Sequence, residues 1–188
     1  MTLRNSDDER QQDHVLGTAE LRLSKPGRKE FGVRQRNPVT VVLDGVMGHY
    51  NIGAIFRLCD AFLVERLIIC RTVVALRNRR FIQAAAGTQH WVPWQEENDA
   101  AIFVRAAKAS GQWIAVVELT AESQSPAALE PRFPAILVLG SESSGVSPGV
   151  LAQADQAIAI PMLGMANSLN VATAGAIVLH ELVRRWTC

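Results

Sequence analysis

Two runs of apolar residues without polar alternation constrain the fold of this chain more than any other feature. The run from Ala135 to Leu139 stops at Gly140, and the run from Ala157 to Ile160 stops at Pro161. Uninterrupted apolar strands are typical of a parallel sheet covered on both faces, and ligands of such sheets bind beyond the carboxyl ends of the strands. We therefore expect an α/β fold with a ligand site in the loops that follow these runs.

The rest of the chain alternates strand and helix patterns, which favours a parallel sheet with helical crossovers. Further strands are predicted at residues 39–43, 67–70 and 113–119, with a short one near 91–94. Helices are predicted at 52–62, at 99–109 with Asn98 as its cap and Gly111 at its end, and at 169–186. No element is assigned to residues 72–87, which are rich in arginine and alanine.

The length of 188 residues predicts one folded domain, which we place at residues 38–188. Residues 1–37 are polar and poorly periodic and are predicted to form an extension whose second half is basic. That half either binds phosphate groups of a partner or is a solvated tail, and the sequence leaves both open. A second basic cluster contains Arg77, Arg79 and Arg80.

The cysteine and histidine positions argue against several classes of protein. Cys59, Cys70 and Cys188 have neither metal nor redox spacing, which argues against a disulfide framework and favours a reducing cytoplasm. The four histidines are scattered, so no metal is predicted. The polar N-terminus and the absence of 18 consecutive apolar residues predict neither secretion nor membrane insertion.

The stretch from Gly140 to Gly145 has the glycine spacing of a phosphate-binding loop, but Val146 stands where that motif needs lysine. A serine-hydrolase elbow is also excluded, because the G-x-S-x-G order is missing. Glycine at 140 and 164 would let backbone approach a ligand closely. The helix that begins near Ser168 or Asn170 favours an anionic group at its start.

Three short pieces of the sequence together resemble a known family. They are Asn51, Gly53 and Arg57 in the first, residues 137–142 with Gly145 in the second, and residues 160–162 with 168–170 in the third. In this order they resemble the three motifs of the SpoU (TrmH-type) RNA 2'-O-ribose methyltransferases of the SPOUT superfamily, over roughly residues 39–185. The second motif departs from the family in reading Glu-Ser-Ser-Gly where a small-basic pair before the glycine is common.

The resemblance implies a SPOUT-type Rossmann-like parallel sheet with a deep trefoil knot at the C-terminus, although pattern alone would predict an unknotted sheet. It also implies a homodimer with contacts from the first-motif helix and from the last helix with Trp186. The implied cofactor is S-adenosyl-L-methionine, held by loops after three strands. The residues expected to bind it are Leu119, Leu139, Gly140, Ile160, Met162, Ser168 and Leu169.

The catalytic residues implied by the resemblance are Arg57, Asn51, Glu142, Ser168 and Asn170. Arg57 would act on the ribose 2'-hydroxyl, either as a base or by orienting the ribose or a phosphate. We expect a buried Glu142 paired with Arg57, because unpaired buried charges are costly. Judged by position alone, Asn51, Ser168 and Asn170 are also suited to capping helices.

The implied function is S-adenosylmethionine-dependent methylation of a ribose 2'-hydroxyl in tRNA or rRNA. Arg28, Lys29 and Arg57 are the expected RNA contacts. Two alternatives stay open: a catalytically weak RNA-binding SPOUT protein, and a SPOUT methyltransferase that acts on a base.

Overall fold

A computed structural model describes residues 17–23 and 25–187, apart from the side chains of residues 18, 19, 28 and 29. Contacts divide the chain into two units, Met1–Arg34 and Gln35–Cys188. The described part of the first unit contains two short helices, α1 (Thr18–Leu23) and α2 (Arg28–Gly32). Arg28 and Lys29, which are predicted to contact RNA, lie in the first turn of α2, and their side chains fall outside the described structure.

The second unit is built on a six-stranded sheet in which every neighbouring pair is parallel. The strand order is β3-β2-β1-β5-β4-β6. The strands are β1 (Asn37–Asp44), β2 (Val64–Cys70), β3 (Trp94–Glu97), β4 (Trp113–Val117), β5 (Ala135–Gly140) and β6 (Gln156–Ile158). In the centre, Val41 lies opposite Leu67 of β2 and Leu137 of β5. The predicted parallel α/β sheet is confirmed.

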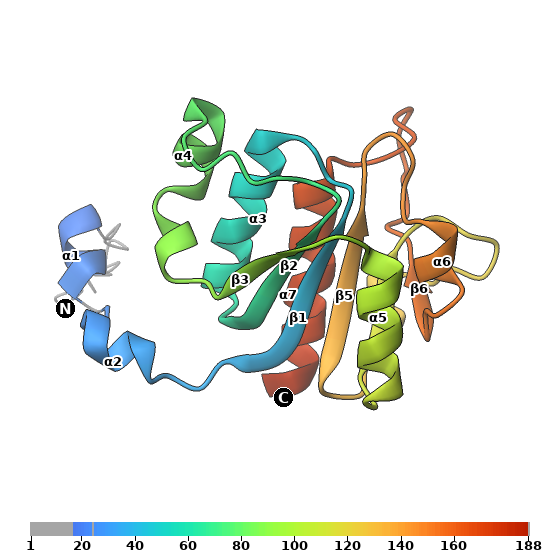
Figure 1. Cartoon of the computed structure of the whole chain (residues 1–188), viewed down its shortest axis with the longest axis horizontal. Helices are drawn as coiled ribbons and strands as arrows, with labels where there is room; N and C mark the ends of the chain where they lie inside the picture. The colour runs from blue at the N-terminus through green and yellow to red at the C-terminus, as the bar shows by residue number, and fades with distance from the viewer. Residues whose placement is uncertain (1–16, 24, 188) are drawn as a thin grey trace, which may run out of the picture. The chain divides into compact units, whose positions relative to one another are not determined.

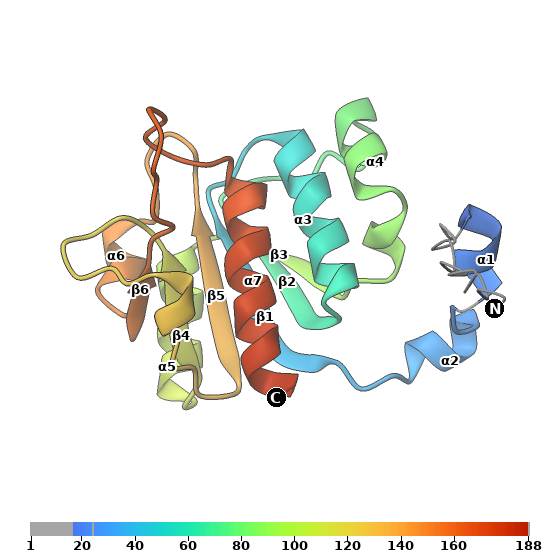
Figure 2. The same cartoon turned by 180° about the vertical axis from the view of Figure 1, so that it is seen from behind.

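Helices cover both faces of this sheet, as Figures 1 and 2 show from opposite sides. On one face lie α3 (His49–Ala61), α4 (Arg79–Ala85) and α7 (Val171–Thr187), and on the other lie α5 (Ala100–Ala109) and α6 (Pro148–Leu151). Successive β1 residues alternate between the layers: Val41 packs with α3 and α7, and Val42 packs with α5 and α6. Because both layers are apolar, the central strands β1 and β5 have no polar alternation.

Several element boundaries differ from those predicted. β4 and β6 end two residues early, at Val117 and Ile158, and β3 begins at Trp94 rather than ending there. Asp99, not Asn98, caps α5, because its Oδ1 accepts a hydrogen bond from Ile102 N at 2.9 Å. Gly111 follows that helix with a φ of 85°, which confirms its predicted place. The short helices α4 and α6 were not predicted.

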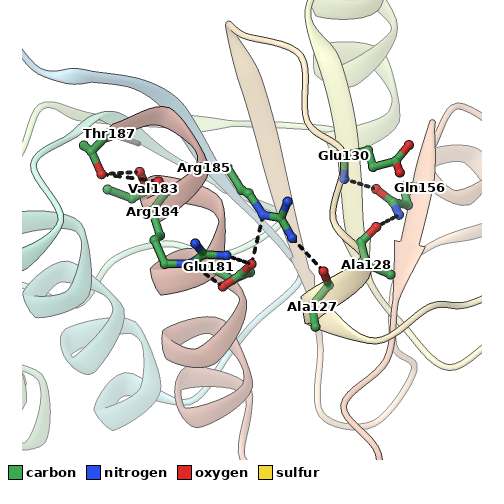
Figure 3. Close-up of polar contacts among 9 residues, drawn as sticks. All are labelled: Ala127, Ala128, Glu130, Gln156, Glu181, Val183, Arg184, Arg185 and Thr187. Atoms are coloured by element: carbon green, nitrogen blue, oxygen red, sulfur yellow. Dashed lines mark hydrogen bonds and ion pairs between the residues drawn. The ribbon is translucent and has the colours of Figure 1, made fainter.

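Polar contacts fasten the second half of α7 (Figure 3). Glu181 accepts hydrogen bonds from Arg184 and Arg185, and Arg185 Nη2 donates to Ala127 O at 2.6 Å in the β4–β5 connection. Hydrogen bonds from Arg184 first, and then from Arg185, lower the pKa of Glu181 to about 2, so this cluster stays charged at neutral pH. Among the described helices, α7 included, none is long and apolar enough to cross a membrane.

Candidate functional site

A cavity of about 760 Å³ lies at the carboxyl ends of β4, β5 and β6 and is bounded by the start of α7. This is the edge of the sheet where sequence analysis placed a ligand. All seven residues expected to bind the cofactor line the cavity: Leu119, Leu139, Gly140, Ile160, Met162, Ser168 and Leu169. The loops that carry them are 117–123, 139–145 and 158–171.

One side chain from each of the three sequence motifs meets the others beside this cavity. The Asn51 amide nitrogen donates to Glu142 Oε1, and the Asn51 amide oxygen accepts from Asn170 Nδ2 at 2.9 Å. Asn51 therefore joins two loops that are 28 residues apart, from Glu142 to Asn170. The sequence gives only the order of the three motifs, whereas the structure connects them by hydrogen bonds.

The expected roles of Asn51 and Glu142 in the fold need correction. Asn51 is not the cap of the first-motif helix, because α3 already begins at His49 behind Gly48. Because Asn51 lies inside the helix and does not cap it, its side chain is available to bond Glu142 and Asn170 in the two loops. Glu142 is exposed and is bonded to Asn51, so the expectation of a buried Glu142 paired with Arg57 was wrong. An exposed carboxylate is solvated and does not need a cationic partner.

Asn170 caps the last helix, as its position suggested. Its Oδ1 accepts from Ala172 N at 3.0 Å and from Thr173 N at 3.3 Å. These two amides were expected to favour an anion, and the Asn170 side chain satisfies them instead. Ser168 is exposed, lines the cavity and lies just ahead of this cap.

Arg57 is exposed on α3 and does not line the cavity. Among the described residues it has no hydrogen-bond or ion-pair partner. Gly53, one turn earlier, faces α4: a Cβ there would lie 2.7 Å from Phe81 O and 2.8 Å from Ala84 Cβ. The first-motif glycine thus serves helix packing rather than ligand approach, and Arg57 is free to contact a molecule from solution.

The loop after β5 makes a tight turn that explains Gly140. Ser141 N donates to Gly145 O at 3.1 Å, and Gly145 N donates back to Ser141 O at 2.9 Å. This turn folds back over Gly140, so a Cβ at that position would lie 2.3 Å from both Gly145 C and Val146 N. Gly140 was expected to let a ligand approach, whereas the structure shows that the close approach is by its own loop. A Cβ at Gly164 would meet nothing within 4 Å.

Sequence analysis missed two carboxylates that hold this loop. Glu118 Oε2 accepts from Val146 N at 2.8 Å, and the fully buried Asp44 accepts from Ser147 N at 2.8 Å. Asp44 is also paired with Arg71 at 2.6 Å. Both acids stand where buried strands end, and an acidic residue directly after an apolar run is the signal that would have found them.

Glu118 contacts all three loops that line the cavity. Its carboxylate accepts from Leu119 N at 3.0 Å in its own loop and from Val146 N in the loop after β5, and its backbone N–H donates to Ile158 O at 3.0 Å. A carboxylate accepts from two amides at once, and an alkyl group accepts from neither.

We expect Glu118→Ala to weaken binding of S-adenosylmethionine about tenfold or more, because the loss of a charge-assisted bond to a loop amide costs about 1.5–3 kcal/mol. Isothermal calorimetry measures this loss. Glu118→Gln keeps one acceptor oxygen, so its affinity for S-adenosylmethionine should fall between those of the wild type and Glu118→Ala. Glu122→Ala, which removes an exposed carboxylate four residues further along the chain, serves as the control. Equal affinities for the Glu118→Ala and Glu122→Ala variants would contradict a role for Glu118 in the loops.

No metal site is evident in the part of the chain that the structure describes, where no three His, Cys, Asp or Glu side chains gather. The cavity instead combines apolar side chains, glycine-containing loops and two carboxylates, Glu118 and Glu142. This set suits a nucleoside with a cationic substituent better than a metal ion or a polyphosphate.

Comparison with known proteins agrees with the motifs. The profile described as the SpoU rRNA Methylase family matches residues 38–180. A tRNA (guanosine(18)-2'-O)-methyltransferase of Thermus thermophilus is 33% identical over 159 residues, which are 84% of this chain and 81% of that protein.

Two solved structures are similar over the same region. One is a TrmH/SpoU tRNA modifying enzyme of A. aeolicus, with a TM-score of 0.73 and 32% identity over 84% of this chain and 79% of that one. The other is an AdoMet-bound rRNA methyltransferase of Sinorhizobium meliloti, with a TM-score of 0.72 and 28% identity over 82% of this chain and 58% of that one. The matched profile spans well over half of the sequence, and the chain therefore belongs to the SpoU rRNA methylase family.

Proposed function

We propose that this protein transfers a methyl group from S-adenosylmethionine to a ribose 2'-hydroxyl of tRNA or rRNA. The observation that carries the proposal is the hydrogen-bonded chain of Glu142, Asn51 and Asn170 beside a cavity lined by every residue expected to bind the cofactor. The names of the relatives, which are tRNA and rRNA methyltransferases, support the same reaction.

The cavity fits S-adenosylmethionine in size and in chemistry. About 760 Å³ is within the usual range of about 300–1,000 Å³ for sites of small ligands. Leu119, Leu139 and Ile160 supply apolar contact for an adenine, and the carboxylates of Glu118 and Glu142 suit a positive charge. When bound, the cofactor supplies an activated methyl group on its sulfonium.

The side chains around the cavity then have to position the ribose and remove the hydroxyl proton. Asn51 holds Glu142 and Asn170 in fixed places, so their oxygens and amide groups are set before RNA binds. Arg57, exposed and without a partner among the described residues, would hold ribose or phosphate oxygens by its planar fork of donors.

Incubation with labelled cofactor and either total tRNA or total rRNA tests this function. Labelled RNA that yields nuclease-resistant dinucleotides after digestion supports ribose methylation. Label that appears in free nucleosides with a modified ring supports the alternative of a base methyltransferase. Cofactor binding without label in either RNA supports the alternative of a catalytically weak RNA-binding protein.

We also propose a homodimer with a second copy docked on α3 and α7. These helices pack side by side and expose three large apolar side chains: Tyr50 is 61%, Ile177 is 40% and Trp186 is 45% exposed. Exposed apolar groups that lie close together often mark an interaction surface, and self-association would cover these three. Light scattering at micromolar concentration should give twice the chain mass; a stable monomer would contradict the dimer.

The basic N-terminal extension, residues 1–37, is proposed to contact RNA phosphates through Arg28 and Lys29. We expect Arg28→Gln/Lys29→Gln to flatten the plot of log affinity against log salt concentration by about 0.7–0.9 for each lost phosphate contact. RNA affinities measured across a potassium chloride series give this slope. An unchanged slope would identify residues 20–36 as a solvated tail.

The SPOUT-type trefoil knot at the C-terminus is likewise a proposal. It is supported by the path of α7, which starts at the cavity loops and ends bonded to Ala127 in the β4–β5 connection. Pulling on both ends of a single molecule tests it, because a knotted chain stays shorter than a fully extended one.

We propose the cytoplasm as the compartment in which the protein works. Cys59 and Cys70 are buried free thiols. Burial raises the pKa of both, that of Cys70 to about 12, so they remain unreactive and suit a reducing environment. Fractionation of cells that produce the protein tests this location.

A further inference from the structure

A cluster of three arginines, Arg77, Arg79 and Arg80, surrounds the start of α4. All three side chains are exposed, and among the described residues none has a hydrogen-bond or ion-pair partner. Arg79 and Arg80 stand in the first turn of the helix, which contains no acidic residue. Three neighbouring guanidinium groups without an acidic partner leave a local excess of positive charge, which favours an anionic partner.

The segment that carries this cluster is fastened at several points. Thr72 Oγ1 donates to Val46 O at 3.0 Å, and Val74 N donates to Glu96 Oε1 at 2.7 Å. Asn78 caps α4, where its Oδ1 accepts from Arg80 N at 2.9 Å. Because the backbone is held in this way, little ordering of the chain would be needed when the arginines bind a partner.

The cluster lies at the same end of the sheet as the candidate site. Figures 1 and 2 both show α4 at the end where α3 and α7 begin and where the loop after β5 lies. Phe81, Ala84 and Ala85 of α4 are buried, and Gly53 of α3 packs against this side of the helix. Arg79 and Arg80 precede Phe81 and are turned to solvent. A polymer that crosses the start of α3 can therefore reach both Asn51 and the arginines.

We propose that Arg77, Arg79 and Arg80 bind the phosphate backbone of the RNA while the target ribose lies beside the hydrogen-bonded chain of Glu142, Asn51 and Asn170. The inference rests on the proposed function and adds a second contact region to it. Guanidinium groups pair with phosphate oxygens through two parallel hydrogen bonds. Contacts of this kind position an RNA without reading its sequence.

Two double variants, each of which removes two positive charges, test the proposal. Arg79→Gln/Arg80→Gln removes two charges from the cluster. Arg105→Gln/Arg132→Gln removes two exposed arginines that also have no partner among the described residues, from α5 on the opposite face and from the loop before β5. Affinity for bulk bacterial tRNA is measured by fluorescence anisotropy across a potassium chloride series, and affinity for S-adenosylmethionine is measured by calorimetry.

The cluster variant should bind tRNA about 10–30 fold more weakly near 0.15 M salt, with a slope flatter by about 1.4–1.8, since each phosphate contact contributes about 0.7–0.9. The control variant should match the wild type, and both should keep the affinity for S-adenosylmethionine. Equal slopes for the two variants would overturn the proposal and leave an acidic protein surface as the partner to consider. A protein that shows the slope difference but methylates neither tRNA nor rRNA would refute the proposed function and not the RNA surface.

Discussion

We expect Gly140→Val to abolish binding of S-adenosylmethionine. A Cβ at Gly140 would lie 2.3 Å from backbone atoms of Gly145 and Val146, and backbone cannot move aside as a flexible side chain can. The turn from Ser141 to Gly145 would have to open, which would displace Glu142 and break the bond between Val146 N and Glu118. The cavity would lose the shape of one of its three loops.

The strain should exceed about 3 kcal/mol, because overpacking by a side chain commonly costs about 1–3 kcal/mol and here the clash is with backbone. If the loop absorbs the strain, the loss of affinity is about 100-fold or more. Calorimetry measures the affinity, and circular dichroism with thermal unfolding reports whether the sheet is retained. We expect a folded protein of lower stability, since the layers on both faces of β5 are unchanged.

Gly164→Ala separates this explanation from a simple need for space beside the ligand. Gly164 also lines the cavity, but no protein atom would lie within 4 Å of a Cβ at that position. We expect near-normal affinity for Gly164→Ala. Equal loss in both variants would show that the ligand, and not the turn, excludes a side chain at Gly140.

The sheet was predictable because its signal is local. The run 135–139 is apolar at every position, the run 39–43 is interrupted only by Thr40, and the structure buries both sides of β1 and β5. Once the strands were known to be parallel, their carboxyl ends had to share one edge, which brings Gly140 and Ile160 to the same cavity. The short helices α4 and α6 were missed, since helices of seven and four residues are too short to show a clear period.

The internal contacts of the site were not predictable, because they depend on how distant segments are aligned. Asp44 reaches Ser147 across 103 residues, and Asn51 reaches Asn170 across 119. Whether Asn51 caps α3 or joins two loops depends on a shift of the helix start by two or three residues, which sequence patterns do not resolve.

We expect Arg57→Ala to lower methylation about 10²–10³ fold, the usual effect of removing one donor that acts in the transition state. Its affinity for S-adenosylmethionine should stay normal, because Arg57 does not line the cavity and has no partner among the described residues. Single-turnover methylation measures the first quantity, and calorimetry measures the second. Arg105→Ala, an exposed arginine on α5, is the matched control. A parallel loss of cofactor affinity would place Arg57 in the cofactor site instead.

Arg57→Lys decides between the two roles that the sequence left open. A lysine amine loses its proton near pH 10.4, whereas a guanidinium keeps its proton to well above pH 12. If residue 57 is the base, lysine should do the same work more easily, and activity of the variant should rise toward that of the wild type between about pH 7 and 10. If the arginine orients ribose or phosphate through its planar fork, lysine cannot hold two oxygens at once and stays inactive at every pH. We expect the second result, because Arg57 is exposed and has no hydrogen-bond or ion-pair partner among the described residues, which leaves its fork of donors available to hold two oxygens at once.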